Sequence, residues 1–162
     1  MTKAKISNLG TSHDNKNVYI DYNNTNVGYH LLETPNLISL VKEAIPKLRI
    51  GDKEQVVLSF DLGRIVGTTN LVKTEKDDEI LYAKRIGRTS YSRFVKHKKP
   101  VKCSNIVIVL RKGSTGYNLW TSMCGNILPK DAYIKDSNFN NTHALVYDEK
   151  LIQPETVTYS RP

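Results

Sequence analysis

The sequence predicts an α+β fold in which an N-terminal helix packs on an antiparallel β-sheet within a single compact domain. Three observations lead to this prediction. One segment near residues 35–48 has apolar residues at helical spacing, many short runs rich in β-branched and aromatic residues follow it, and no segment of helical length separates those runs. A chain of 162 residues also has the usual size of one domain with one core.

The helix is expected to run from Pro35 to Leu48. Thr34 is a suitable N-cap and a proline is well tolerated at the first helical position. Pro46 removes a backbone hydrogen bond, so it should separate the last turn from the rest. The apolar residues that recur with the helical period are Leu37, Leu40, Val41, Ala44, Ile45 and Leu48.

The strands are expected on both sides of this helix. Residues 18–22 and 27–32 predict a hairpin joined by the turn residues 23–26, and residues 112–116 contain two glycines that suit a second hairpin. Because no helix intervenes, the pairing should be antiparallel. Residues 1–17 are polar without a sustained period, which predicts a flexible N-terminal arm and a domain over residues 18–162. The strands expected after the helix are residues 55–60, 65–69, 79–85, 90–95, 105–112, 117–124 and 142–147.

Composition narrows the environment in which the chain works. No apolar run approaches the roughly 20 residues of a membrane span, and the N-terminus has no apolar signal segment, so a cytoplasmic protein without membrane contact is expected. Cys103 and Cys124 lack the spacing of a zinc site. Reduced thiols are favoured over a disulfide, which remains an alternative if the two lie on neighbouring strands.

Positive charge is concentrated in one part of the chain. There are 24 Lys and Arg residues against 16 Asp and Glu, a formal net charge of +8, and no acidic residue occurs from Ile80 to Lys130. The positive charges repel one another, and this repulsion destabilises the folded chain unless a polyanion neutralises them. A phosphate backbone that neutralises them also releases its bound counterions, which favours binding. This favours a nucleic-acid partner over a merely solvated lysine surface.

Basic and aromatic residues alternate within residues 82–96. In a strand Tyr91, Arg93 and Val95 would share one face, and Tyr82 and Lys84 would likewise share a face. Cations can hold phosphates while rings stack on bases. The residues expected to bind nucleic acid are Lys84, Arg85, Arg88, Arg93, Lys96, Lys98, Lys99 and Lys102.

RNA cleavage by the 2′-hydroxyl needs a base, an acid and cations around the phosphorane, but no metal. His13 lies in the polar arm and His97 lies among lysines, so His30 or His143 is the better acid or base. Thr121 and its neighbour Ser122 are hydroxyls on an otherwise apolar strand and are candidates for a phosphate contact, although hydroxyls at the edge of a core are commoner.

The stretch from Asp78 to Gly125 (DEILYAKRIGRTSYSRFVK, SNIVIVLRK and GYNLWTSMCG) resembles the barnase, EndoU, colicin and RelE-like (BECR) superfamily of metal-independent ribonucleases, many of which are toxins. The resemblance implies working residues on the sheet face. It would place Lys84, Arg88, Tyr91, Arg93 and Thr121 at the site, with His30 or His143 as the acid or base.

The resulting hypothesis is a toxin-like endoribonuclease that acts on RNA without a cofactor or a metal. Its alternatives are a nucleic-acid-binding protein without catalysis and a basic protein that binds an acidic partner such as an antitoxin or immunity protein.

The acidic residues 75–79 could bind a divalent ion, but an exposed turn before a strand is the favoured interpretation.

Overall fold

The computed structural model describes residues 6–22, 27–30, 34, 36–75, 77–84, 90–96, 98–126, 132–133, 144–146 and 152–154. The chain forms two compact units, whereas the sequence suggested a single domain. Unit 1 contains residues 1–68 and 102–127, and unit 2 contains residues 69–101 and 128–162. Apolar side chains gather in two separate clusters, a large one in unit 1 and a small one in unit 2, and this is the physical reason for the division.

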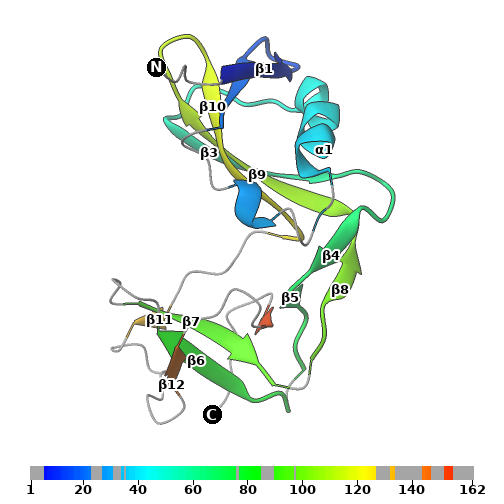
Figure 1. Cartoon of the computed structure of the whole chain (residues 1–162), viewed down its shortest axis with the longest axis vertical. Helices are drawn as coiled ribbons and strands as arrows, with labels where there is room; N and C mark the ends of the chain where they lie inside the picture. The colour runs from blue at the N-terminus through cyan, green and yellow to red at the C-terminus, as the bar shows by residue number, and fades with distance from the viewer. Residues whose placement is uncertain are drawn as a thin grey trace. The chain divides into compact units, whose positions relative to one another are not determined.

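Unit 1 is built on a five-stranded sheet with the order β1-β2-β10-β9-β3 (Figure 1). The strands pair antiparallel, except that β2 and β10 run parallel. The predicted strands at 105–112 and 117–124 and the hairpin between them are confirmed. The strands are β1 (Ile6–Thr11), β2 (Asn17–Asp21), β3 (Gln55–Asp61), β9 (Asn105–Lys112) and β10 (Tyr117–Cys124).

The expected flexible arm is wrong for residues 6–17. β1 pairs with β2, and Leu9 is only 4% exposed within the core of unit 1. A register shift between Asn8 and Gly10 interrupts the alternation of β1, which concealed the strand in the sequence. The second strand expected at residues 27–32 is also wrong, because β1 and β10 already flank β2 and Val27–His30 form the 3-10 helix η1.

The expected helix is present but shorter, and it is not N-terminal to the sheet, since β1 and β2 precede it. α1 (Leu37–Ala44) buries its apolar stripe against the sheet, and the 3-10 turn η2 (Ile45–Lys47) contains Pro46. The division at Pro46 is therefore confirmed. The N-cap is Asn36 with φ 58° rather than Thr34, and Pro35 lies outside the described residues.

Unit 2 contains a four-stranded sheet with the order β11-β7-β6-β12. The predicted strand at 90–95 is confirmed as β7 (Ser90–Val95), which pairs antiparallel with β6 (Ile80–Lys84). β11 is Ala132–Tyr133, and β12 (Ala144–Val146) runs parallel to β6, so the expectation of antiparallel pairing holds only in part. Leu81, Ala83 and Phe94 form the small core on one face.

Two short sheets complete the described structure. β4 (Gly67–Thr69) pairs with β8 (Val101–Cys103), and β5 (Leu71–Val72) pairs with β13 (Gln153–Pro154). Among the described residues, no helix has the length and apolar character that crossing a membrane requires.

The two cysteines form a disulfide, so the expectation of reduced thiols is wrong. Cys103 in β8 and Cys124 at the end of β10 lie with their Cα atoms 6.6 Å apart. The β9–β10 hairpin brings them together, because Cys124 is paired with Ile106, three residues after Cys103.

Candidate nucleic-acid interface

The residues predicted for the site are divided between the two units. His30, Lys102 and Thr121 belong to unit 1, whereas Lys84, Tyr91, Arg93, Lys96, Lys98 and Lys99 belong to unit 2. For Lys84 the structure describes only the strand position, and Arg85, Arg88 and His143 lie outside the described residues. Each unit therefore contains part of the predicted site and is described by itself.

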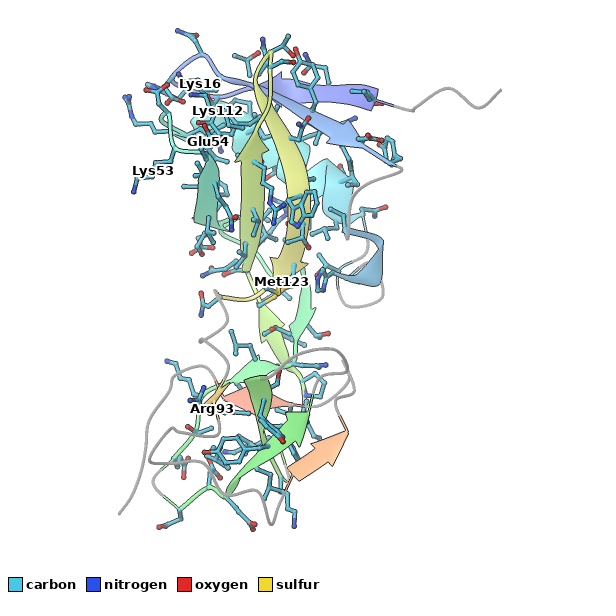
Figure 2. All side chains as sticks on the ribbon, turned by 90° about the vertical axis from the view of Figure 1, so that its left-hand side faces the viewer. Lys16, Lys53, Glu54, Arg93, Lys112 and Met123 are labelled. Atoms are coloured by element: carbon cyan, nitrogen blue, oxygen red, sulfur yellow. A yellow bond between two sulfur atoms is a disulfide. The ribbon has the colours of Figure 1, made fainter. Side chains whose placement is uncertain are left out.

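In unit 2, the ladder between β6 and β7 brings aromatic and basic residues together. Tyr82 is paired with Arg93, and the register position of Lys84 is opposite Tyr91. Residues directly opposite in an antiparallel pair share a face, and this face is opposite the small core around Phe94. The prediction that Tyr91, Arg93 and Val95 share one face of the strand is thus confirmed. Tyr91 and Arg93 are half-buried, and Figure 2 shows Arg93 in this sheet.

The lysines that follow β7 differ in their surroundings. Lys98 Nζ lies 3.3 Å from the carboxylate of Asp78, so part of its charge is neutralised within the chain. The backbone N–H of Glu75, which donates to Asp78, lowers the pKa of that carboxyl, and Lys98 lowers it further. Lys96 and Lys99 in unit 2 and Lys102 in unit 1 are exposed. Lys98 therefore fits a phosphate contact less well than predicted, because its charge is already partly paired.

In unit 1, one face of the five-stranded sheet carries a cation, an aromatic ring and a hydroxyl that the sequence did not bring together. We call it the outer face, because it is opposite the face on which α1 packs (Figure 2). The registers place Arg111 between Gln55 and Asn118, and Val109 between Val57 and Thr121. Val57 is 40% exposed. The outer face consists of Gln55, Val57, Ser59, Val107, Val109, Arg111, Asn118, Trp120, Thr121 and Met123.

The guanidinium of Arg111 is stacked on an indole near the end of this face, beside the turn between β9 and β10. Its Cζ atom lies 3.8 Å from the centroid of the Trp120 ring. Stacking leaves the N–H groups at the edge of a guanidinium available to phosphate oxygens. The hairpin signal at residues 113–116 could have revealed this pair, since residues 111 and 118 lie opposite each other and residue 120 is diagonal to 111.

A bulge in β10 decides which hydroxyl faces outward. The register shifts between Leu119 and Thr121, so Trp120 and Thr121 both lie on the outer face while Ser122 turns inward. Ser122 is fully buried and its hydroxyl donates to the Val107 carbonyl at 2.6 Å. Nothing in the sequence distinguishes the Thr121 and Ser122 hydroxyls, but in the structure they lie on opposite faces of the sheet.

Thr121 Oγ1 is a buried oxygen for which the described residues offer no hydrogen-bond partner. Leaving such a group unpaired costs about 1–3 kcal/mol. An orphaned hydroxyl on a half-buried face that also carries a cation is suited to a ligand oxygen. His30 lies at the end of η1, which packs beside β10 in the same unit (Figure 2).

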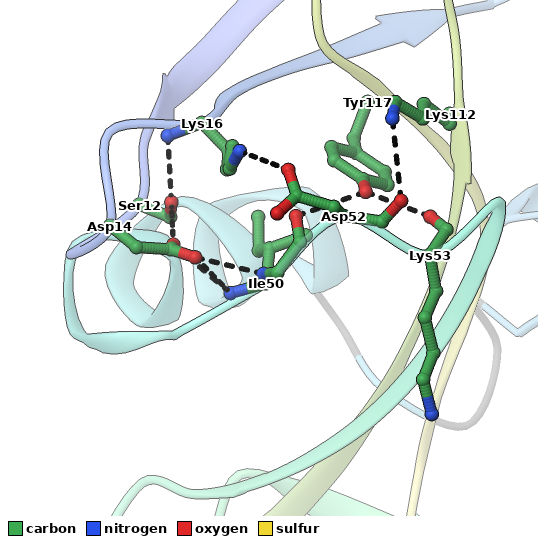
Figure 3. Close-up of polar contacts among 9 residues, drawn as sticks. Ser12, Asp14, Lys16, Ile50, Asp52, Lys53, Lys112 and Tyr117 are labelled. Carbon is green, nitrogen blue, oxygen red and sulfur yellow. Dashed lines mark hydrogen bonds and ion pairs between the residues drawn. The ribbon is translucent and has the colours of Figure 1, made fainter.

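A polar network fixes the strands that carry the outer face (Figure 3). The Tyr117 hydroxyl, at the start of β10, lies 3.0 Å from the Gly51 carbonyl and 2.8 Å from the Lys53 carbonyl. Lys16 forms an ion pair of 2.6 Å with Asp52. The loop before β3 is therefore tied to the first residue of β10.

Asp14 closes the same network. Its carboxylate accepts the Ser12 hydroxyl and the backbone N–H groups of Ile50 and Gly51, and these hydrogen bonds hold its pKa far below the ordinary value. The turn between β1 and β2 is thereby joined to the loop before β3.

No group of His, Cys, Asp and Glu within the described part of the chain could hold a metal ion. Comparison of the chain with protein-family models, with curated proteins and with solved structures gave no match.

Proposed function

We propose that this protein binds single-stranded RNA on the outer face of unit 1 and cleaves it as a metal-independent endoribonuclease. The observation that carries the proposal is the stack of Arg111 on Trp120 beside the unpaired hydroxyl of Thr121. It combines a ring system, a cation and a hydrogen-bonding group on one half-buried sheet surface.

The chemistry of this face favours single strands. An aromatic side chain within a sheet surface can stack only on bases that are already unstacked, and such contacts tolerate every base. The second segment of unit 1, residues 102–127, contains Lys102, Arg111 and Lys112 and no acidic residue. A phosphate backbone crossing this segment would meet no carboxylate from it.

The cleavage step requires a base to accept the proton of the 2′-hydroxyl as its oxygen attacks phosphorus, and an acid to protonate the departing 5′-oxygen. His30, the candidate histidine of unit 1, supplies one of these groups in the proposal. Arg111 stabilises the negative charge that develops on the phosphorane, and the Thr121 hydroxyl donates to one of its oxygens. On unit 2, taken by itself, Lys84, Arg88, Tyr91 and Arg93 are proposed to bind nucleotides.

The test is incubation of the protein with single-stranded RNA in EDTA. We expect products ending in 2′,3′-cyclic phosphate and 5′-hydroxyl, while single-stranded DNA stays intact because it lacks the nucleophile. His30→Ala should slow cleavage by about 100-fold or more if His30 is the acid or base. His13→Ala is the matched control, since the exposed His13 lies in the turn between β1 and β2. RNA that stays intact on prolonged incubation with micromolar protein would contradict catalysis.

A second candidate is nucleic-acid binding without catalysis. The described part of the β6–β7 ladder favours it, because Tyr91 and Arg93 are half-buried residues on one of its faces and this part of the ladder contains no histidine. In that case Arg93→Ala would weaken binding and reduce its salt dependence, and no turnover would be seen. An acidic protein partner would instead be revealed by co-purification of a small acidic chain.

A further inference from the structure

Among the described strands, β3 lies at one edge of the unit 1 sheet, and its hydrogen bonds to β9 show which of its backbone groups face outward. The Lys112 N–H donates to the Glu54 carbonyl at 2.7 Å, and the Leu62 N–H donates to the Ser104 carbonyl at 2.9 Å. Both contacts join even-numbered residues of the β3 segment to β9. Because bonded pairs alternate in an antiparallel ladder, the odd-numbered residues direct their N–H and C=O groups away from the sheet. These residues are Gln55, Val57, Ser59 and Asp61.

This edge lacks the features that usually protect an edge strand from pairing. β3 is seven residues long, its register with β9 has no shift, and it contains no proline, lysine or arginine. The opposite edge of the same sheet, β1, does carry a register shift, between Asn8 and Gly10. A long, regular strand with free backbone groups is a template for another strand.

We infer that two copies of this protein pair through β3, antiparallel about a two-fold axis, so that their five-stranded sheets join. In the register that overlaps the whole strand, Val57 lies opposite Ser59 of the second copy and Gln55 lies opposite its Asp61. Every outward-facing backbone group of β3 then meets an outward-facing group of the other copy. No like charges come opposite each other within the strand.

Charge complementarity supports a second copy as the occupant of this edge. Asp61 is the one ionisable residue of β3. In the two-fold register Lys53, two residues before the strand, lies diagonal to Asp61 of the second copy. Lys53 is exposed, and the described residues give it no ion-pair partner (Figure 3). The arrangement would therefore form two identical ion pairs, one at each end of the joined strands.

The test is sedimentation of the whole chain over the micromolar concentration range, which should show a monomer–dimer equilibrium. Ser59→Lys places a charge on an outward-facing position and should leave a monomer at concentrations where the wild type is dimeric. Ser114→Lys adds the same charge in the exposed turn between β9 and β10 and should leave the dimer intact. Ser59→Pro is a second variant, because an edge strand tolerates proline where its N–H faces outward.

Lys53→Glu tests the register itself. Bringing a carboxylate beside Asp61 of the second copy should weaken association by about 3- to 10-fold. Wild-type protein that sediments as a monomer throughout, or a dimer that survives both Ser59→Lys and Ser59→Pro, would overturn the inference. An unchanged dimer in Lys53→Glu would overturn this register. These outcomes are independent of whether the protein binds or cleaves RNA.

Discussion

Replacing the stacked pair on the outer face provides the most direct test of RNA binding in unit 1. Stacking of a base on an aromatic side chain contributes about 1–3 kcal/mol. Trp120→Leu keeps an apolar side chain on the sheet but removes the ring, so Kd should rise by roughly 5- to 150-fold. Arg111→Lys keeps the charge and loses the planar stack, which contributes about 0.5–1 kcal/mol at an exposed site and predicts a 2- to 5-fold rise.

Arg111→Ala removes the charge as well, and its signature is the salt dependence. One lost phosphate contact should reduce the slope of log Kd against log salt by about 0.7 on a single strand. The assay is fluorescence anisotropy with a labelled 2′-O-methyl oligonucleotide, which cannot be cleaved, at several salt concentrations. Trp120 is the only tryptophan, so its emission reports on the same site.

Lys42→Ala is the control, because this exposed lysine lies on α1, which packs on the opposite face of the sheet. It removes one positive charge without touching the outer face. Equal Kd values for wild type, Trp120→Leu and Arg111→Ala would refute the assignment of RNA to this face. A loss of affinity in Lys42→Ala equal to that in Arg111→Ala would show that only net charge matters.

Three further predictions concern the scaffold of unit 1. Asp14→Asn should lower the free energy of unfolding by about 1 kcal/mol after allowance for solvent screening. Because folding lowers the pKa of Asp14 from 3.8, this stabilisation is complete above about pH 5 and is lost as pH falls further, so urea denaturation curves of wild type and variant should converge in acid. Gly116→Ala would place Cβ 2.5 Å from a backbone oxygen of β2 and should cost about 1–3 kcal/mol, whereas Gly113→Ala meets a movable amide at 2.8 Å and should cost less in the same assay. Replacing Cys103 and Cys124 by serine should cost up to about 3 kcal/mol, and dithiothreitol should lower Tm of the wild type alone, since the disulfide closes a loop in the unfolded chain.

The sequence predicted those strands whose residue pattern and bounding turn lie close together in the chain. β9 and β10 are continuous β-branched and aromatic runs around a glycine turn, and both were predicted with their observed ends. β1 was missed because a single inward leucine and a bulge leave no alternation to detect. The parallel pairing of β2 with β10 joins segments about a hundred residues apart, and no local pattern encodes it. The division into two units depends on the same long-range pairing.

The candidate site shows the same limit. The two-residue period of a strand predicted that Tyr91 and Arg93 share a face, and their partners on β6 are consistent with this. Thr121 faces outward only because of the bulge after Leu119, since an unbroken alternation from Leu119 would have turned Thr121 inward. A bulge of this kind depends on the partner strand, so the sequence could not predict it. The choice of Thr121 came from the family resemblance.

The cations of residues 80–130 have no carboxylate within the same stretch of chain. This stretch supplies β6 and β7 to unit 2 and β9 and β10 to unit 1, so each unit receives a ladder that contains no carboxylate. The described ion pairs join Lys16, Arg64 and Lys98 to carboxylates that all lie outside this stretch. Arg111, near the end of β9, is stacked on a ring, and no described ion pair joins it to an acid. A phosphate would then add a charge contact without displacing an ion pair, which is the reason to expect the outer face of unit 1 to contribute most of the affinity for RNA.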